Sequence, residues 1–234
     1  MKTLLLKFSG PLQAWGTNSH FETRATDFYP SKSGVIGFLS ACLGYRRDED
    51  EKIQTLNDLD FAVRVDQDGR LLRDYQIASK WKNDGSFDTN YVTERYYLED
   101  AVFVVALASE DDPWMEELAL AVQHPYFQPY LGRRSAPPTA DVVIGLFDET
   151  AMEALREFPW QAQKWFQKEG NRIRPIYADT SLIGQEEGKF RRDRVLSFSQ
   201  KNRQFGFRGE ASTTIELELQ EHQTEHDAFS AIGE

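Results

Sequence analysis

The chain has 234 residues, of which 40% are hydrophobic and 13% aromatic, so it can bury a sizeable core and is not a disordered polymer. Its single cysteine, Cys42, excludes an intrachain disulfide and predicts a buried thiol in a reducing, cytoplasmic compartment. No apolar run approaches the ~18 residues of a membrane span, and the leucine run near the N-terminus is too short for a signal peptide. The net charge of −11 argues against non-specific binding of nucleic acid.

The charge is unevenly distributed along the chain. Residues 1–47 carry a net charge of +4 and residues 189–208 one of +6, whereas the last 26 residues hold seven acidic side chains and no lysine or arginine. A polyanion site in the basic segments is one interpretation, with the acidic surface repelling stray RNA. Ordinary patchiness of a solvated surface is the other, and charge alone does not separate the two.

The N-terminal region is predicted to hold one strand, a long loop and one helix. Lys2–Phe8 is the expected strand, and residues 10–31 show no sustained periodicity, which is typical of a functional loop. Ser31 or Ser33 can cap a helix whose apolar residues recur at three- and four-residue spacing. Gly44 suits the left-handed position at its end.

The next segments predict strands around an insertion. A short helix is expected within residues 48–60, followed by strands at 61–65 and 71–77 that are joined by an Asp-Gly turn. Residues 79–90 are polar and lie between β-prone segments, which favours a protruding hairpin. Residues 101–108 are almost continuously apolar, which fits a strand buried on both faces.

The remaining elements are less regular. Asp112 is expected to cap a helix through about Gln123, and residues 142–147 form one more strand. Residues 150–170 have a helical pattern that Pro159 interrupts, and two further strands are expected at 194–199 and 212–219.

The order of these elements predicts an α+β fold. Strand, helix, strand, inserted hairpin, strand, helix, strand is the ferredoxin-like or RRM-like order, β-α-β-β-α-β. We expect this domain to span residues 1–148, with a thumb hairpin at about 70–97. Residues 149–234 are expected to form a smaller β-containing region packed on the first domain, ending in an acidic tail at about 216–234.

Four segments in order carry a family resemblance: Gly10-Pro-Leu-Gln-Ala-Trp-Gly16, residues 21–44, Tyr130-Leu-Gly-Arg-Arg-Ser135 and Arg203-Gln-Phe-Gly-Phe-Arg208. Together they resemble the Cas-five family of CRISPR-associated proteins, in the form found in the type I-E surveillance complex called Cascade. The resemblance is strongest over residues 8–47 and 126–137 and weak over about 148–190.

The resemblance implies a non-catalytic RNA-binding subunit in antiviral defence. Such a subunit grips the 5′ handle of the CRISPR RNA in a ribonucleoprotein complex and contacts the neighbouring backbone subunit and the large PAM-reading subunit. It implies no cofactor, no metal, no membrane and no small-molecule substrate.

The long loop and the helix start supply the groups of a phosphate site. A Ser-Lys-Ser-Gly turn at a helix start offers unpaired backbone N–H groups, hydroxyls and one ammonium. We therefore expect RNA contacts in this region from Gln13, Arg24, Thr26, Lys32, Ser33 and Gly34. The alternatives are that Lys32 is merely solvated and that Gly34 serves helix packing.

Aromatic and arginine residues extend this prediction. Trp15 and Tyr130 are expected to stack on splayed bases, and Arg133 and Arg134, followed by Ser135, to hold phosphates. Trp15 is otherwise a core aromatic, and the two arginines are otherwise paired with acids of the chain itself.

Two further groups have open roles. Lys80, Trp81 and Lys82 in the thumb are expected to touch either RNA or the next subunit. Of Arg203 and Arg208, one is expected to have a structural or subunit-contact role.

A metal-independent endoribonuclease that processes CRISPR repeat RNA is the rival function. It needs a general base and a general acid, and the available candidates are His20, Tyr29 and Lys32 in the long loop. This inventory is too common to specify a site, and in the subfamily resembled here a separate subunit cleaves the RNA. RNA binding without catalysis is therefore the preferred function.

Overall fold

The computed structural model describes residues 1–16, 22–184 and 188–219. The strands are β1 (Lys2–Ser9), β2 (Leu12–Gln13), β3 (Thr23–Arg24), β4 (Asp60–Gln67), β5 (Arg70–Trp81), β6 (Phe87–Glu99), β7 (Val102–Ser109), β8 (Val143–Phe147), β9 (Ile173–Asp179), β10 (Lys189–Ser197) and β11 (Gln204–Glu216). The helices are α1 (Lys32–Cys42), α2 (Asp50–Thr55), the 3-10 turn η1 (Leu56–Asp58), α3 (Asp112–Gln123), α4 (Ala151–Glu157), α5 (Lys164–Glu169) and α6 (Thr180–Ile183). None of the helices in these ranges is long and apolar enough to cross a bilayer.

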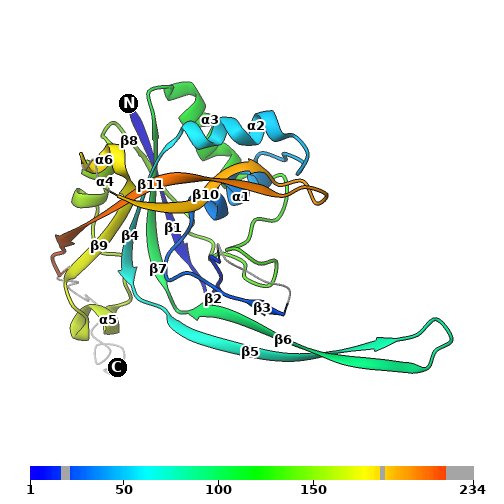
Figure 1. Ribbon diagram of the computed structural model, residues 1–234. Coiled ribbons are helices and arrows are strands. Elements are labelled where there is room, and N and C mark those ends of the chain that lie inside the picture. Colours follow the sequence, from blue (N-terminus) through cyan, green and yellow to red (C-terminus); the bar gives the residue numbers. More distant parts are fainter. Residues whose placement is uncertain (17–21, 185–187, 220–234) are drawn as a thin grey trace, which may run out of the picture.

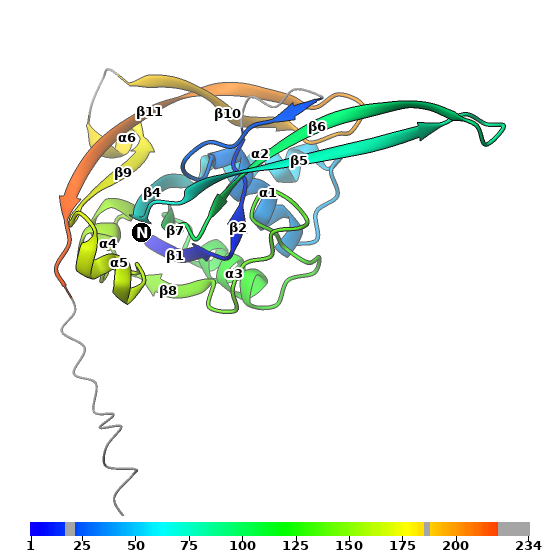
Figure 2. The ribbon, with the colours of Figure 1, turned by 90° about the horizontal axis from the view of Figure 1, so that it is seen from below.

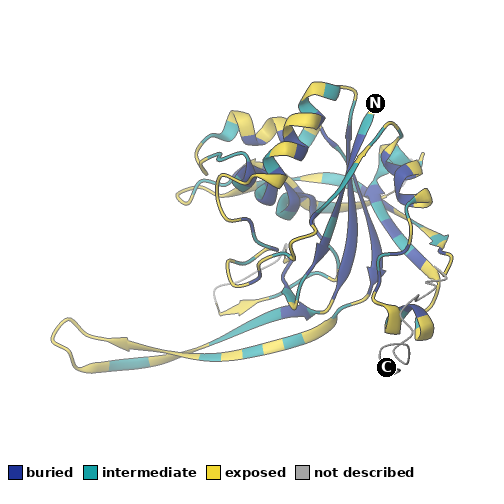
Figure 3. Ribbon diagram, turned by 180° about the vertical axis from the view of Figure 1, so that it is seen from behind, coloured by how far each residue is buried: buried dark blue, intermediate teal, exposed yellow. Residues whose placement is uncertain are grey.

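One seven-stranded antiparallel sheet organises the molecule, in the order β10-β11-β9-β4-β7-β1-β8 (Figures 1 and 2). β1 lies between β7 and β8, and β7 lies between β1 and β4. The apolar run predicted at residues 101–108 is confirmed as the strand β7, in which every residue but the last is buried. It is buried on both faces because helices cover both sides of the sheet (Figure 3).

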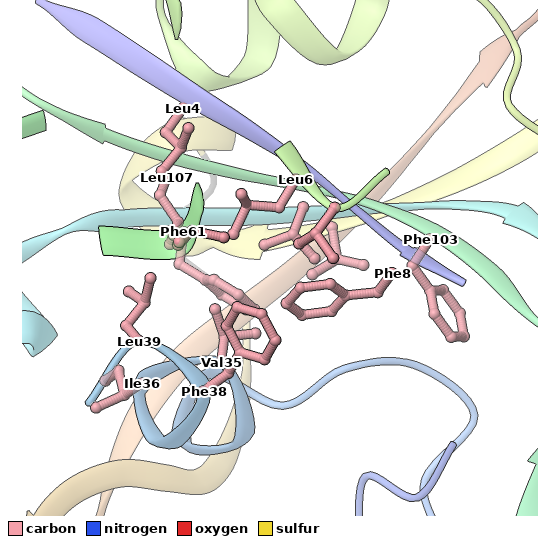
Figure 4. Packing of buried hydrophobic residues seen from close by; sticks show 14 of the residues in the cluster. Leu4, Leu6, Phe8, Val35, Ile36, Phe38, Leu39, Phe61, Phe103 and Leu107 are labelled. Carbon is pink, nitrogen blue, oxygen red and sulfur yellow. The ribbon is translucent and has the colours of Figure 1, made fainter. Parts of the chain in front are cut away.

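Alternating side chains of β1 divide the core into two layers. Leu4, Leu6 and Phe8 point to the layer that contains α1 and α3 (Figure 4), whereas Leu5 points to the layer that contains α4. Each is 0% exposed. Full burial of one such side chain contributes roughly 1.5–3 kcal/mol, so the two layers fix the position of β1 and of the segment that follows it.

The local signals explain most element boundaries. Ser31 caps α1 through a hydrogen bond from the Gly34 N–H, and Gly44 follows the helix with φ of 76°. The cap of α3 is Asp111, one residue before the predicted Asp112, because its side chain accepts the Trp114 N–H. Pro159 separates α4 from α5, as expected.

The C-terminal strands extend the same sheet. β9 pairs with β4, β11 pairs with β9 and β10 pairs with β11, so these three strands extend the sheet that β4, β7, β1 and β8 form. The sequence did not predict β9. The division into two regions at residue 148 stays a prediction.

Side-chain amides close the outer edge of β10. The Asn57 side chain accepts the Val195 N–H at 3.0 Å and donates to the Val195 carbonyl at 2.8 Å. Gln54 Nε2 donates to the next carbonyl, that of Leu196, at 2.7 Å. These two side chains take the hydrogen-bonding positions that a neighbouring strand would occupy.

β5 and β6 form a long hairpin, the thumb, that projects from the body (Figures 1 and 2). Its base is held by β2 and β3, which pair with β6 on its other side. Farther out it carries exposed apolar side chains, among them Tyr75, Ile77, Trp81 and Val92. Lys80, Trp81 and Lys82 lie near the tip, where Lys80 pairs with Asp88 at 2.8 Å.

Candidate nucleic-acid interface

The predicted phosphate site at the start of α1 is already filled by the protein itself. The Lys32 N–H donates to Asp193 Oδ2 at 2.9 Å, and the Lys32 ammonium donates to Asp179 Oδ2 at 3.0 Å. Lys32 is only 7% exposed. Its expected RNA contact is therefore wrong, because both its charge and its backbone N–H are used internally.

Gly34 serves the packing of α1 against Trp15. A Cβ on Gly34 would lie 2.9 Å from Trp15 Cε3, so only glycine lets helix and indole meet. The neighbouring Ser33 is half-buried and its hydroxyl lies 3.4 Å from that of Ser31. The Gly34 N–H is used by the Ser31 cap at 3.2 Å.

Trp15 and Gln13 belong to the core, which corrects their prediction as RNA contacts. Trp15 is 1% exposed and stacks on Phe8 with ring centroids 5.5 Å apart. Its indole N–H donates to Gln13 Oε1 at 3.1 Å, and Gln13 Nε2 donates to the Ala101 carbonyl at 2.8 Å. A base has no access to this ring. Thr26 is likewise structural, since its hydroxyl accepts the Trp15 N–H at 2.8 Å.

A buried ion network lies between α1 and the strands β9, β10 and β11, and consists of Lys32, Arg191, Arg208, Asp27, Asp179, Asp193 and Glu210. Arg208 donates to Asp193 Oδ1 at 2.7 Å and to Asp179 Oδ1 at 3.0 Å. Arg191 pairs with Asp27 and Glu210 at 2.9 and 3.0 Å. Of the two arginines left open by the sequence, Arg208 therefore has the structural role.

A second group of arginines lies at the base of the thumb. We call Arg24, Arg95, Tyr97, Arg133, Arg134 and Ser135 the thumb-base cluster. Strand β3 pairs with β6 so that Arg24 lies opposite Arg95. The Arg133 guanidinium lies 4.5 Å above the Tyr97 ring, and its Nη2 donates to the Arg24 carbonyl at 2.8 Å. Three separate segments, β3, β6 and the loop after α3, thus meet at one place.

The thumb-base arginines lack acidic partners. The ion pairs within residues 1–16, 22–184 and 188–219 include Arg64, Arg174, Arg191 and Arg208, but none of the four arginines of this cluster. Nε of Arg95 and Nη1 of Arg133 are buried and have no hydrogen-bond partner among these residues. A buried charged donor without a partner is costly, so the cluster has hydrogen-bonding capacity that no described residue meets.

The pKa of Tyr97 depends on the side chains around it in the cluster. Burial by itself raises the pKa of Tyr97, but hydrogen bonds with Ser135 and Arg133 and the charges of Arg133 and Arg95 lower it below its ordinary value. The hydrogen bond with Ser135 and the contacts with the two arginines thus together favour the ionised form of the phenol.

The loop that carries Arg133 is rigid. Leu131 donates its N–H to the Ala136 carbonyl at 2.7 Å and accepts the Ala14 N–H at 3.1 Å. Gly132 has φ of 83°, and a Cβ there would lie 1.5 Å from the Ala14 carbonyl oxygen. The loop therefore presents Arg133, with Arg134 and Ser135 exposed next to it, in a fixed position.

Sequence reasoning named four of the six cluster residues and missed Arg95 and Tyr97. Both lie in the thumb strand β6 without any motif around them. The available signal was an arginine and a tyrosine two residues apart, which places them on the same face of a strand. Tyr130 is half-buried and lies near Arg203 rather than in the cluster. His20 lies outside the described residues.

The comparisons with known proteins point to one family. The family model described as CRISPR-associated protein (Cas_Cas5) matches residues 3–209. The CRISPR system Cascade subunit CasD of Escherichia coli (strain K12) is 41% identical over 157 residues, which cover 61% of this chain and 70% of CasD.

Solved structures agree with this match. A chain of a structure described as a CRISPR RNA-guided surveillance complex superposes with a TM-score of 0.76 and 30% identity, covering 92% of this chain and 90% of that chain. A second structure, described as a Cas protein, has a TM-score of 0.68 and 32% identity, covering 92% of this chain and 95% of that one.

Proposed function

Because the chain belongs to the Cas5 family of CRISPR-associated proteins, we propose that it is a non-catalytic RNA-binding subunit of a type I-E CRISPR surveillance complex and grips the 5′ handle of the CRISPR RNA. The observation that supports this most directly is the thumb-base cluster, whose four arginines have no acidic partner among the described residues and whose Arg95 Nε and Arg133 Nη1 are buried without a hydrogen-bond partner there.

The chemistry of the cluster suits an RNA phosphate. Nε of Arg95 and Nη1 of Arg133 have no hydrogen-bond partner among the described residues. Arginine binds phosphate through its guanidinium N–H groups more specifically than an ammonium does. Arg24 and Arg134 are exposed beside them and add charge. The Ser135 hydroxyl, which contacts Tyr97, is a further polar group for a sugar or phosphate.

The thumb is proposed to join neighbouring subunits, namely the backbone subunit and the large PAM-reading subunit. Ile77 and Val92 face each other across the hairpin and are 59% and 44% exposed, and Trp81 at the tip is 62% exposed. An isolated two-stranded hairpin with exposed apolar side chains is typical of a segment that a partner covers. Replacing residues 79–90 by a short Gly-Ser turn should leave the protein folded but reduce its entry into the complex.

The core is proposed to be ferredoxin-like. The strands that alternate with α1 and α3 lie in the order β8-β1-β7-β4, all antiparallel, with the thumb inserted between β4 and β7. That order and the two helices on one face support this assignment.

A catalytic role is not proposed. Tyr29 stacks on Tyr177 at 3.7 Å and donates its hydroxyl to Glu210, and burial raises its pKa far above neutrality. Lys32 is held in an ion pair. Neither is available as a general base or acid. We propose a cytoplasmic location, which suits the buried thiol of Cys42.

The test is a titration of CRISPR 5′-handle RNA with the full chain at several salt concentrations. Arg133→Ala and Arg95→Ala should each weaken binding about 10- to 100-fold, as expected for a lost charged hydrogen bond worth roughly 1.5–3 kcal/mol. Each should also lower the log–log salt slope by roughly 0.7, since one phosphate contact is lost. Arg156→Ala, on α4 on the other face of the sheet, is the matched control. Unchanged affinity in both cluster variants would remove the proposed site.

A further inference from the structure

Exposed aromatic side chains gather where α1 ends. The Tyr126 and Phe127 N–H groups donate to the Cys42 and Ala41 carbonyls at 2.9 and 3.0 Å, which fixes this segment on the end of the helix. Tyr126 is 74% and Phe127 44% exposed. The two rings meet edge to face with centroids 4.7 Å apart, and the Tyr126 ring lies against Gly44. Both rings are therefore held in place, and each still exposes a large part of its surface to solvent.

The tip of the β10–β11 hairpin brings a cation to the same region. The Arg203 guanidinium lies 5.0 Å above the Phe205 ring and 5.7 Å above the Phe198 ring. Phe198 in turn packs on α1, where it comes within 3.6 Å of the Cβ position of Gly37. The side chain of Arg203 is thus pre-ordered on two rings while it remains exposed.

Two arginines near each other in this region, Arg47 and Arg203, form no ion pair with a described acidic residue. The pKa of Arg203 is lowered first by desolvation and then by the charge of Arg47, and Tyr130 opposes this shift. Neither Arg47 nor Arg203 has an ion pair with any other described residue. Arg47 follows the end of α1 and is exposed. Asp48 and Glu49 follow Arg47 in the chain, but neither forms an ion pair with it, so both guanidinium groups keep N–H donors for an anion.

The region is joined to the thumb-base cluster by a short, rigid segment. Tyr130 and Arg133 are three residues apart, so their Cα atoms lie within about 11 Å of each other. The segment is held by the hydrogen bonds of Leu131 to Ala14 and Ala136. In Figures 1 and 2 the tip of β10–β11 and the thumb project to the same side of the molecule.

We propose that Arg47, Tyr126, Phe127, Tyr130 and Arg203, here called the α1 corner, form a second single-stranded RNA surface, and that one strand crosses the loop 130–135 between this surface and the thumb-base cluster. At a stacked rise of ~3.4 Å per nucleotide, ~11 Å corresponds to about three nucleotides. This inference rests on the proposed function and adds a second contact region and a path for the strand.

RNA suits the α1 corner better than an acidic protein surface does. The corner combines open aromatic faces, on which bases stack, with unpaired guanidinium groups that reach phosphates. That combination is typical of surfaces that track a single strand. Its place beside the thumb-base cluster means that a strand leaving that cluster meets the α1 corner next.

The experiment compares two lengths of RNA on the full chain. One is the shortest handle RNA that still shows the Arg133→Ala effect, and the other is extended by several nucleotides at whichever end increases affinity. Arg47→Ala, which removes an exposed side chain, should weaken binding of the extended RNA about 5- to 20-fold and lower its salt slope by roughly 0.7. It should leave the shortest RNA unchanged. Arg203→Lys keeps the positive charge on the hairpin tip but removes the planar guanidinium that lies over Phe198 and Phe205, so it tests the shape of this cation separately from its charge. Arg156→Ala is again the control.

The outcomes separate the two proposals. If Arg133→Ala weakens both RNAs while Arg47→Ala, Arg203→Lys and Tyr126→Ala weaken neither, the α1 corner is not an RNA surface although the proposed function stands. If the same variants leave RNA affinity intact but reduce assembly of the surveillance complex, the corner binds a protein and the inference is wrong. If no variant in either region affects RNA, both proposals fail.

Discussion

The buried ion network and the thumb-base cluster use the same side chains for opposite purposes. In the network, Arg191 and Arg208 are surrounded by four carboxylates and hold β10 and β11 against α1. In the thumb-base cluster, Arg95 and Arg133 meet no carboxylate and leave guanidinium N–H groups unpartnered. An arginine therefore indicates a ligand site only where the fold places no carboxylate beside its guanidinium group.

The largest expected effect is on folding, from breaking the network. Arg208→Ala removes the guanidinium that donates twice to Asp193, which is 0% exposed, and one of the two cations that bind Asp179. Loss of one partner of such a buried pair costs about 3–5 kcal/mol of unfolding free energy. Urea unfolding of the full chain measures it, with the exposed neighbour Arg192→Ala as control, which should change stability by less than about 0.5 kcal/mol. Equal stability of the two variants would contradict the structural role of Arg208.

The second prediction concerns the loop that carries Arg133. It distinguishes the loss of stability that comes from a misplaced loop from the loss that comes from backbone strain alone. Gly132→Ala combines a positive φ with a clash against the Ala14 carbonyl, whereas Gly85→Ala in the thumb turn has φ of 82° and no atom within 4 Å. The strain common to both costs roughly 1–2 kcal/mol. Only Gly132→Ala should cost more than this and also weaken handle RNA binding, because the loop that carries Arg133 must move. Equal behaviour of the two in melting and RNA titration would show that the position of the loop is unimportant.

The third effect is the pH dependence of the network. Burial by itself raises the pKa of Glu210, but the charges of Arg191 and Arg208 and the hydrogen bond from Tyr29 lower it below its ordinary value of 4.5. A lowered carboxylate pKa contributes stability that is fully present above the unfolded-state pKa and is lost as the pH falls through the folded-state pKa. Urea midpoints should therefore fall on acidification below about pH 4.5, and less steeply in Glu210→Gln. A steeper fall in the variant would contradict this assignment.

The smallest effect belongs to the exposed arginines of the thumb-base cluster. Arg24→Ala and Arg134→Ala remove no buried group, so stability should change by less than about 0.5 kcal/mol. Handle RNA binding should weaken less than in Arg133→Ala and equally for different RNA sequences, with a salt slope lower by roughly 0.7 for each lost contact. A larger loss than in Arg133→Ala would place the main phosphate at the exposed residues instead.

Patterns within short stretches of sequence predicted the helices and strands that such patterns are enough to specify. The spacing of Val35, Ile36 and Leu39 after Ser31 predicted α1, and the apolar run at residues 101–108 predicted β7. β9 was missed because Arg174 and Pro175 interrupt the apolar pattern of this segment. In the structure Arg174 is nevertheless buried, and its Nε donates to the Val65 carbonyl. A strand in which arginine points inward has no simple period in sequence.

The site was harder to predict because its partners are distant in the chain. Lys32 at a helix start resembles a phosphate ligand until Asp179, 147 residues later, is seen to bind it. Arg95 has no motif, and its role depends on β3 and on the loop that holds Arg133. The sequence shows which side chains are charged, whereas their neutralisation depends on long-range pairing.

The Asn57 side chain has a consequence for how copies of this protein behave at high concentration. Because its amide binds both the N–H and the carbonyl of Val195, β10 offers no open backbone there for another chain to extend the sheet. The sheet ends on the other side at β8. Strand-to-strand self-association, the first step toward fibrous aggregates, is thereby directed away from the β10 edge by two neutral side chains, Asn57 and Gln54, without a charge that would disturb the nearby arginines.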